Sequence, residues 1–338
     1  MTVYLRPIPR LGLPRPAEAH PLAGSDTAWF TEVECLSRDA APQIVPAHEV
    51  DPTDLRRLSA ARAPVAGLTL NVPRLMGIVN VTPDSFSDGG DFARHETAIA
   101  HGERLAADGA DILDIGGEST RPGSDAVPED EELRRTAPVI SALRERLPTP
   151  ISIDTRKAAV GRAALDAGAD MLNDVAAFTY DPAMAELADE RMAPVCLMHA
   201  QGDPKTMQQA PSYDDVLLDV YDFLAERVAV AETAGIPRER VVVDPGIGFG
   251  KTVEHNLALL ARLSLFHGLG CALLLGASRK RFIGTIGGGD AAKQRVPGSL
   301  AVALAGAMHG AHIIRVHDVA ETRQALALWT ATTTGRFA

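Results

Sequence analysis

Cysteine is scarce in this sequence, and its scarcity excludes two classes of protein. Cys35, Cys196 and Cys271 are the three cysteines in a chain of 338 residues, and they lie far apart. Three scattered thiols are too few for a disulfide framework and lack the spacing of a zinc site. Cys196 and Cys271 fall in apolar runs, so we expect them to be small buried hydrophobic side chains in a reducing cytosol.

Long apolar runs and an excess of positive charge are also missing. No run reaches the roughly 20 apolar residues of a membrane-spanning helix. Prolines in MTVYLRPIPRLGLPRP occupy the stretch where a signal peptide needs an apolar core. The sequence therefore predicts a cytoplasmic protein without a membrane partner. Its 33 basic and 44 acidic residues give a net charge of −11, which argues against nucleic-acid binding. A few local cations could still hold a small anionic substrate.

The composition and the periodicity of the sequence change near residue 64. Residues 1–64 are rich in Pro and Ala and show weak periodicity, apart from a short helix expected over 53–62. We interpret them as an N-terminal extension, partly irregular, in which we find no chemistry. Residues 65–338 are interpreted as the main domain. At its start, 65–72 could form a small hairpin that closes the floor of a barrel, and Gly-rich 287–290 resembles a flexible loop.

From residue 65 onward, short apolar runs alternate with amphipathic helical stretches. Strands are expected over 75–81, 111–115, 151–153, 171–175, 194–198, 241–243, 272–275 and 313–316. Helices are expected over 96–108, 130–147, 157–167, 182–191, 213–234, 253–266, 298–309 and 319–329. Eight such units predict an α/β protein whose parallel strands close into a (β/α)8 TIM barrel. A doubly wound open sheet is the alternative, although it usually has fewer strands.

Polar residues come at the ends of the predicted strands, where a barrel of this class carries its functional groups. They are Asn80, Asp114, Asp154, Asn173 with Asp174, His199, Asp244, Lys280, and Arg315 with His317. One polar residue after a strand is common, but eight strand ends together predict a single site on one rim. Asp114 and Asp174 could equally be structural, and His199 could be a packed or capping histidine.

The chemistry of these groups suits an aromatic anion. Asp154, Asn173 and Asp244 offer acceptors and an amide to a flat heterocycle with adjacent N–H donors and a carbonyl group. Lys280 can donate to such a ring, or could act as a Schiff-base nucleophile if its pKa were lowered.

Packing and charge at the other strand ends fit the same ligand. Met198 and Phe249 could pack on the faces of the ring. Arg315 and His317 stand two residues apart on a strand, so both could clamp one anion. The polar loops 82–92 and 118–124 are interpreted as mobile lids.

The motifs resemble those of the dihydropteroate synthases. GIVNVTPDSFSDGG at 77–90 and GADILDIGGESTRPGS at 109–124 are similar to the two long motifs of that family. Later motifs follow in the family's order: IDTRK at 153–157, ND at 173–174, MH with QG at 198–202, DPGIGFGK at 244–251, SRKRFIG at 278–284 and RVHDV at 315–319. The resemblance covers about residues 65–332 and leaves 1–64 outside the common pattern.

The resemblance implies an enzyme that transfers an alkyl group to an aryl amine in folate biosynthesis. It would condense (7,8-dihydropterin-6-yl)methyl diphosphate with 4-aminobenzoate, require Mg²⁺, form a homodimer and be a target of sulfonamides. The catalytic residues that it implies are Asp154, Lys280, Arg315 and His317.

The resemblance also implies a role for each matching position. Asp154, Asn173, Asp244 and Lys280 would hold the pterin ring, with Met198 packed against it. Arg315, His317 and Asn80 would hold the diphosphate, and Asn80 would ligate Mg²⁺. The aminobenzoate site would be organised by Thr120, Arg121, Phe249 and Ser278, with Asp84 and Phe86 closing it.

Two departures and two other functions bear on this interpretation. Arg281 stands where many family members carry Ser, and Ala200 replaces a larger or polar residue of some members.

A methyltetrahydrofolate-dependent methyltransferase would share the ring contacts but not the second loop or the Arg315–His317 clamp. A non-catalytic paralogue should have lost loop residues such as Thr120 or Arg121.

Overall fold

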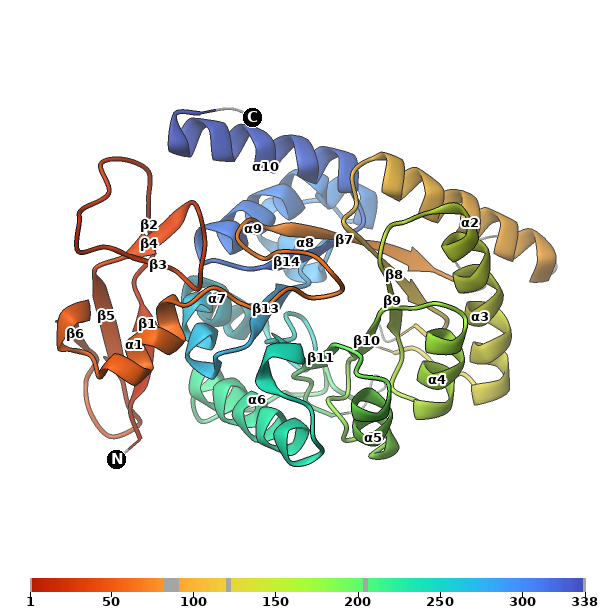
Figure 1. The fold of residues 1–338 in the computed structure, drawn as a ribbon, viewed down its shortest axis with the longest axis horizontal. Coiled ribbons are helices and arrows are strands. Elements are labelled where there is room, and N and C mark those ends of the chain that lie inside the picture. The colour runs from red at the N-terminus through yellow and green to blue at the C-terminus, as the bar shows by residue number, and fades with distance from the viewer. Residues whose placement is uncertain (1, 82–90, 120–122, 203–205, 337–338) are drawn as a thin grey trace.

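The computed structural model describes residues 2–81, 91–119, 123–202 and 206–336. Eight parallel strands form a closed barrel (Figure 1). They are β7 (Arg74–Asn80), β8 (Ile112–Gly116), β9 (Ile151–Asp154), β10 (Met171–Asp174), β11 (Val195–Met198), β12 (Val241–Asp244), β13 (Ala272–Leu275) and β14 (Ile313–Val316). β14 pairs with β7 and completes the ring. The predicted (β/α)8 barrel is confirmed, and the open sheet is excluded.

Helices surround the barrel and connect its strands. They are α2 (Asp91–Ala107), α3 (Glu129–Arg146), α4 (Ala158–Asp166), α5 (Ala183–Glu190), α6 (Val216–Thr233), α7 (Val253–Ala261), α9 (Val296–Met308) and α10 (Val319–Thr334). The helix expected over 253–266 is divided: α7 ends at Ala261, and a 3-10 helix, η4 (Leu263–Leu269), follows.

The connection after β13 contains a helix that the sequence did not reveal. α8 (Arg281–Gly287) begins directly after Lys280. Four glycines lower the helix propensity of this stretch and its flank, which is why it resembles a loop. Gly288 and Gly289 end the helix at φ +80° and +102°, and Arg295 Nε donates to Gly289 O at 2.9 Å. The loop at 287–290 is therefore tied to the helical segment that follows it.

Two apolar layers lie on the two sides of the strands. The larger layer packs between the strands and the surrounding helices. The smaller one fills the barrel interior with side chains such as Met76, Met171 and Val242, and it includes Val65 and Leu70. Val65 and Leu68 form a bridge of two backbone hydrogen bonds. The expected hairpin at the barrel floor is confirmed, and Val65 and Leu70 close the floor with apolar surface.

The N-terminal segment carries two small antiparallel sheets beside the barrel (Figure 1, left). One has the order β1 (Tyr4–Pro7), β5 (Glu32–Leu36), β6 (Gln43–Pro46), and the other β2 (Arg10–Leu11), β4 (Ala28–Phe30), β3 (His20–Pro21). Strands of two to five residues are too short to give a periodic signal. The helix expected over 53–62 is α1 (Pro52–Ser59), capped by Asp51.

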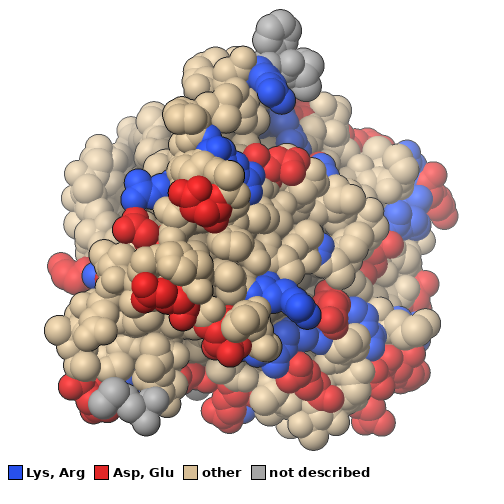
Figure 2. All heavy atoms as spheres, turned by 60° about the vertical axis from the view of Figure 1, so that its left-hand side comes forward, with Lys and Arg blue, Asp and Glu red and all other residues tan. Residues whose placement is uncertain are grey.

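Side chains tie this segment to the barrel. Ser264 donates to Pro7 O at 2.8 Å, and Arg62 Nε donates to Cys271 O at 3.0 Å. The face that carries the small sheets shows Lys and Arg interspersed with Asp and Glu (Figure 2). Cys196 and Cys271 are buried and unpaired, as expected. No helix in the described ranges is long and apolar enough to cross a membrane.

Candidate active site

Four strand ends meet in one hydrogen-bonded group inside the barrel. Arg315 Nε donates to Asp114 Oδ2 at 2.6 Å, and the Nη2 of Arg315 donates to Asp154 Oδ2 at 2.8 Å. Asn173 Nδ2 donates to Asp114 Oδ2 at 3.1 Å. These residues come from β14, β8, β9 and β10. β8, β9 and β10 are neighbours in the barrel, β7 separates β14 from β8, and the alternation of side chains along each strand turns all four residues inward. Asp114 is therefore part of the site rather than a separate strand-end support.

Burial sets the charge properties of this group. Burial raises the pKa of Asp154 to about 7, although the Arg315 guanidinium opposes the shift. For Arg315, burial lowers the pKa, but Asp114 and Asp154 outweigh it and leave the pKa above its ordinary value. One buried oxygen of each carboxylate, Oδ1, has no hydrogen-bond partner among the described residues. A buried acceptor of this kind calls for a donor, which a ligand's N–H group can supply.

The other half of the rim comes from β12 and β13. Lys280 Nζ lies 4.3 Å from the ring centroid of Phe249 and donates to Ile247 O. Asp244 Oδ1 accepts from Gly246 N at 2.7 Å. Burial lowers the pKa of Lys280 to about 7, with Asp244 opposing and Arg315 adding to the shift. Burial also raises the pKa of Asp244, against the charge of Lys280.

Gly276 joins the two halves. A Cβ placed there would lie 3.5 Å from Asp244 Oδ2 and 3.9 Å from Arg315 Cβ, so the two side chains flank it. Asp154, Asp244, Lys280 and Arg315 are thus neighbours on one rim, as the sequence predicted. The space beside Gly276 is kept open by the missing side chain.

The remaining predicted residues occupy the same rim. Met198 is buried and pairs in register with Asp244. Ser278 Oγ lies 3.0 Å from His317 Nδ1 and accepts from the backbone N–H of His317 at 3.2 Å. Asn80 ends β7 opposite Gly116. Arg315 lies on β14 and His317 comes directly after it, but each has its own partner: Arg315 has two carboxylates and His317 has Ser278.

Four predicted site residues lie outside the described residues: Asp84, Phe86, Thr120 and Arg121. Their expected roles in the two loops stay predictions. Arg281, the departure noted in the sequence, begins α8 with an exposed side chain.

Two residues that could have been functional have structural partners. Asp174 accepts from the backbone N–H groups of Ala176 and Phe178 at 2.8 and 2.7 Å, so it holds the turn after β10. His199 packs its ring against Phe223, with centroids 4.9 Å apart. Burial lowers the pKa of His199 to about 2, so it stays neutral.

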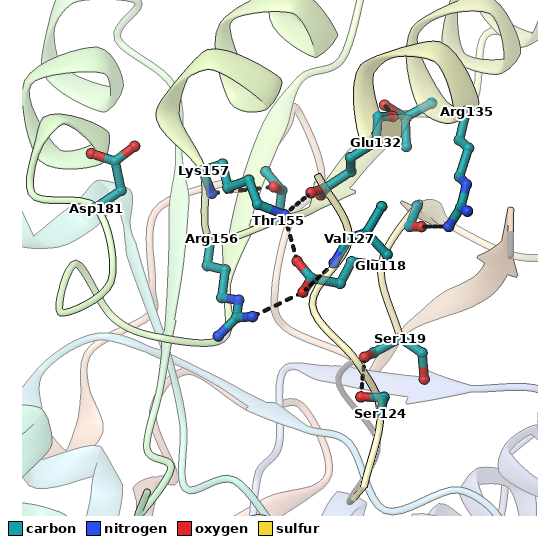
Figure 3. A network of polar contacts seen from close by, with 12 residues as sticks. Glu118, Ser119, Ser124, Val127, Glu132, Arg135, Thr155, Arg156, Lys157 and Asp181 are labelled. Carbon is teal, nitrogen blue, oxygen red and sulfur yellow. Dashed lines mark hydrogen bonds and ion pairs between the residues drawn. The ribbon is translucent and has the colours of Figure 1, made fainter. Parts of the chain in front are cut away.

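A buried ion network beside the site was not predicted (Figure 3). Lys157 Nζ lies 2.7 Å from Glu118 Oε2 and 2.5 Å from Glu132 Oε2, and an Nη2 of Arg156 lies 2.8 Å from Glu118 Oε1. Glu118 follows β8, while Arg156 and Lys157 follow Asp154 on β9. The network thus joins two loops that leave the catalytic rim. Its bonded partners lie 25 to 39 residues apart. The motifs ESTRPGS and IDTRK contain Glu118, Arg156 and Lys157, whereas Glu132 lies outside both motifs.

Burial affects the pKa values of Glu118, Glu132 and Lys157 differently. For Glu118, burial alone would raise the pKa, but Arg156 and Lys157 hold it below its ordinary value. For Glu132, burial raises the pKa, and Lys157 offsets this in part. Lys157 keeps a raised pKa despite burial, because both carboxylates favour its charged form. The charge of Lys157 is what allows two acidic groups to be buried together.

The (β/α)8 barrel and the polar residues at its strand ends define the class of protein: a barrel enzyme that binds a flat polar ring. The comparisons with known proteins identify its family. The sequence model described as "Pterin binding enzyme" matches residues 76–317, and the chain belongs to this family. Within it, the chain groups with the dihydropteroate synthases. It is 49% identical to the enzyme of Escherichia coli K12 over 265 residues, which is 78% of this chain and 93% of that protein.

Other relatives give the same result. The chain is 47% identical to the dihydropteroate synthase of Synechocystis over 259 residues, covering 75% of this chain and 90% of the relative. Its structure is similar to that of Xanthomonas albilineans dihydropteroate synthase with 4-aminobenzoic acid, with a TM-score of 0.76 and 52% identity. That likeness covers 80% of this chain and 97% of the other.

Proposed function

We propose that this chain is a dihydropteroate synthase, which condenses (7,8-dihydropterin-6-yl)methyl diphosphate with 4-aminobenzoate to 7,8-dihydropteroate and diphosphate. The observation that carries the proposal is the meeting of Asp154, Asn173, Asp244, Lys280 and Arg315 at one end of the barrel. Support comes from Xanthomonas albilineans dihydropteroate synthase, which has been solved with 4-aminobenzoic acid and with 7,8-dihydropteroate.

Ring recognition follows from the donors and acceptors on the rim. The unpartnered Oδ1 of Asp154 lies where the N–H edge of a pterin can donate to it. Asn173 and Asp244 extend the polar wall, and Lys280 donates to a ring nitrogen or carbonyl. Met198 and Phe249 cover the faces of the ring. A ring seated this way gives the buried carboxylates the partners that they lack.

The reaction breaks the C–O bond to diphosphate and forms a C–N bond at the same CH2 group. The aryl amine is a modest nucleophile, so departure of the diphosphate comes first, in an SN1-like path. Asp154 stabilises the positive charge that develops on the dihydropterin, and Arg315 and His317 take up the negative charge that leaves. The amine then attacks the CH2 carbon, and the diphosphate that has left accepts the proton that the amine loses. Loop closure excludes water that would otherwise capture the cation.

The family implies Mg²⁺, and the residues at this rim fit it. Asn80 presents an amide oxygen, a type of ligand that Mg²⁺ accepts, and its side chain makes no hydrogen bond to another described residue. No cluster of three or more His, Cys, Asp or Glu that could hold a metal occurs in the described ranges. This suits an ion that takes most of its ligands from substrate phosphate and water. Bound Mg²⁺ would neutralise charge on the departing diphosphate.

A two-substrate assay tests the function. Purified protein with the pterin diphosphate, 4-aminobenzoate and Mg²⁺ is expected to release dihydropteroate, detected by mass spectrometry, and to release none when either substrate is omitted. Adding EDTA should slow release at least about tenfold. Pterin binding without product would favour a non-catalytic paralogue. Methyl transfer from methyltetrahydrofolate in place of this product would favour the methyltransferase.

The two groups with pKa values near 7 predict a bell-shaped pH profile of kcat/KM for the pterin diphosphate. Below about pH 7 Asp154 takes up a proton and loses acceptor capacity, and above about pH 7 Lys280 loses the proton that it donates. The rate should fall on both sides of pH 7. Lys280→Met should remove the alkaline limb alone, while any limb due to the substrate's own titration persists. An unchanged alkaline limb in that variant would assign the limb to another group.

The proposed oligomeric state, location, partners and inhibitors rest on the family resemblance. We propose a homodimer formed through barrel helices, in the cytoplasm, with the small-molecule substrates as the other partners and sulfonamides as inhibitors. The apolar helix α9 is compatible with a subunit contact, since Val302 and Leu304 are only partly buried in one chain. The dihydropteroate synthase of Yersinia pestis has been solved with a sulfonamide drug.

A further inference from the structure

One buried lysine near the site takes no part in the mechanism. Lys251 is 3% exposed and lies in the loop between β12 and α7. Its Nζ donates to Gly246 O at 2.9 Å and Phe249 O at 3.0 Å, and it lies 2.8 Å from His199 Nδ1 and 3.4 Å from His199 O. Burial lowers the pKa of Lys251 well below its ordinary value, and none of its hydrogen-bond partners is a carboxylate. The amino group of Lys251 therefore has a complete set of neutral partners.

The partners of Lys251 are parts of two loops that build the pocket. Gly246 O and Phe249 O belong to the β12–α7 loop, and Gly246 O also accepts from the backbone N–H of Phe249 at 3.1 Å. The other two partner atoms, Nδ1 and the backbone oxygen of His199, lie in the segment after β11. The amino group thus binds together the loops that follow Met198 and Asp244.

The segment after β11 and the β12–α7 loop pack so closely that two positions between them have room only for glycine. Gly246 and Gly250 have φ values of +65° and +61°. A Cβ on Gly246 would lie 1.8 Å from His199 O, and one on Gly250 would lie 2.6 Å from Gln201 O. The two loops are therefore in direct contact at Gly246 and Gly250, and Lys251 Nζ adds side-chain hydrogen bonds across that contact.

The loop that Lys251 holds presents two groups to Lys280. Ile247 O accepts from Lys280 Nζ, and the ring of Phe249 lies against the same nitrogen at 4.3 Å. Gly248 closes over the stem of Lys280, since a Cβ there would meet Lys280 Cδ at 2.9 Å. The position of the Lys280 amino group in the pocket therefore depends on the conformation of residues 246–250.

We propose that Lys251 is a positioning residue of the active site. Its hydrogen bonds fix the conformation of the β12–α7 loop, and this loop in turn places Lys280 and Phe249 for the pterin substrate. The proposal rests on the proposed function. Lys251 contacts neither substrate and acts through the carbonyl groups of Gly246 and Phe249. Its loss should weaken substrate binding more than it slows the bound complex, because Lys280 and Phe249 contact the pterin ring and not the bonds that break and form.

The test compares Lys251→Met with wild type and with Lys293→Met, which removes an exposed lysine of the 3-10 helix η5 (Ala292–Arg295). In Lys251→Met, we expect KM for the pterin diphosphate to rise about 10- to 100-fold while kcat changes less than about threefold. The alkaline limb of the pH profile should move upward, because a less tightly packed Lys280 is better solvated. Lys293→Met should match wild type in every measurement.

A rescue experiment separates positioning from stability. In Lys251→Ala, added n-propylammonium replaces the deleted carbons and the amino group, and it should restore a measurable part of kcat/KM. It should have no effect on Lys280→Ala, where the lost amine must contact substrate in an exact pose, or on wild type. Lys251→Gln, which keeps two of three donors, should show a smaller rise in KM.

Each outcome decides the question. A folded Lys251→Met with KM and pH profile within twofold of wild type overturns the proposal. Failure of the Met, Ala and Gln variants to fold assigns Lys251 to stability alone and overturns it as well. If wild type itself forms no dihydropteroate, the proposed function fails instead. Loss of affinity in Lys251→Met with amine rescue in Lys251→Ala supports the positioning role.

Discussion

Arg315→Met is expected to lower kcat/KM for the pterin diphosphate about 1000-fold. Two effects add to that loss. The guanidinium no longer neutralises the departing diphosphate, and groups in this role are worth about 100- to 1000-fold in rate. In addition, the Arg315 contact with Asp154 at 2.8 Å is gone. Asp154 then has its pKa raised further above about 7, because the cation that opposed the effect of burial has been removed.

The pH profile separates these two effects. As the pKa of Asp154 rises in Arg315→Met, the acid limb should move to higher pH. The alkaline limb should move in the same direction, because Arg315 also lowers the pKa of Lys280, so part of the activity returns above neutral pH. The part that does not return measures the direct action of Arg315 on the diphosphate. The protein should remain folded, because Asp154 can take up a proton and Asp114 keeps its hydrogen bond from Asn173 Nδ2 at 3.1 Å.

A matched control comes from the opposite end of the barrel. Arg323 pairs with Asp111, which precedes β8 at the floor side, and it also donates to Gly109 O. Arg323→Met removes an arginine from an ion pair without touching the rim, so its kcat/KM and acid limb should match wild type. Activity of Arg315→Met within threefold of wild type, with an unmoved acid limb, would remove Arg315 from the mechanism.

The barrel was predictable because its signal is local. Each barrel strand is buried on both faces and therefore appears as a continuous apolar run, such as VVVD at β12, between amphipathic helices. The N-terminal sheets lack such a signal. β2 and β3 have two residues each, and their stability depends on pairing with β4 and on a small core around Leu22 and Phe30. Such partners are set by tertiary packing and not by local pattern.

The site was predictable in its members but not in its pairings. Strand-end position placed Asp154, Asp244 and Arg315 on one rim, since all parallel strands of a barrel end on the same side. The sequence suggested that Arg315 would act with His317, its neighbour on the strand. In the structure, the guanidinium instead lies between Asp114 and Asp154, which are about 160 to 200 residues away. Bonds over such separations leave no periodic or spacing signal.

The pairings of Lys157 also left no spacing signal in the sequence, and their loss should have a large effect on stability. Lys157→Met should lower the free energy of unfolding by about 3–5 kcal/mol, the usual effect of removing one partner from a buried ion pair. The side chains of Lys157, Glu118 and Glu132 are 8%, 4% and 0% exposed, so water cannot replace the lost ammonium group. Urea unfolding at pH 7 measures the change. Arg162→Met, which breaks an exposed pair with Glu190, should stay within about 0.5 kcal/mol of wild type.

The pH dependence of this loss has a defined sign. Without Lys157, the pKa of Glu132 in the folded state rises further above its value in the unfolded chain, whereas Glu118 keeps Arg156, which lowers its pKa. Between the two values the folded protein binds more protons, so its stability increases as pH falls. The difference between Lys157→Met and wild type should therefore shrink from pH 8 toward pH 5.5.

A double variant isolates the uncompensated charge as the cause. In Glu132→Gln/Lys157→Met, the fully buried carboxylate is neutral and Glu118 keeps its contact with Arg156 at 2.8 Å. This protein should regain at least about 1 kcal/mol over Lys157→Met, because removing both partners of a buried pair is less damaging than removing one. If the double variant is no more stable than the single one, packing of the lysine stem and not its charge holds the loops after β8 and β9 together. In that case, the difference between the single variant and wild type should not depend on pH.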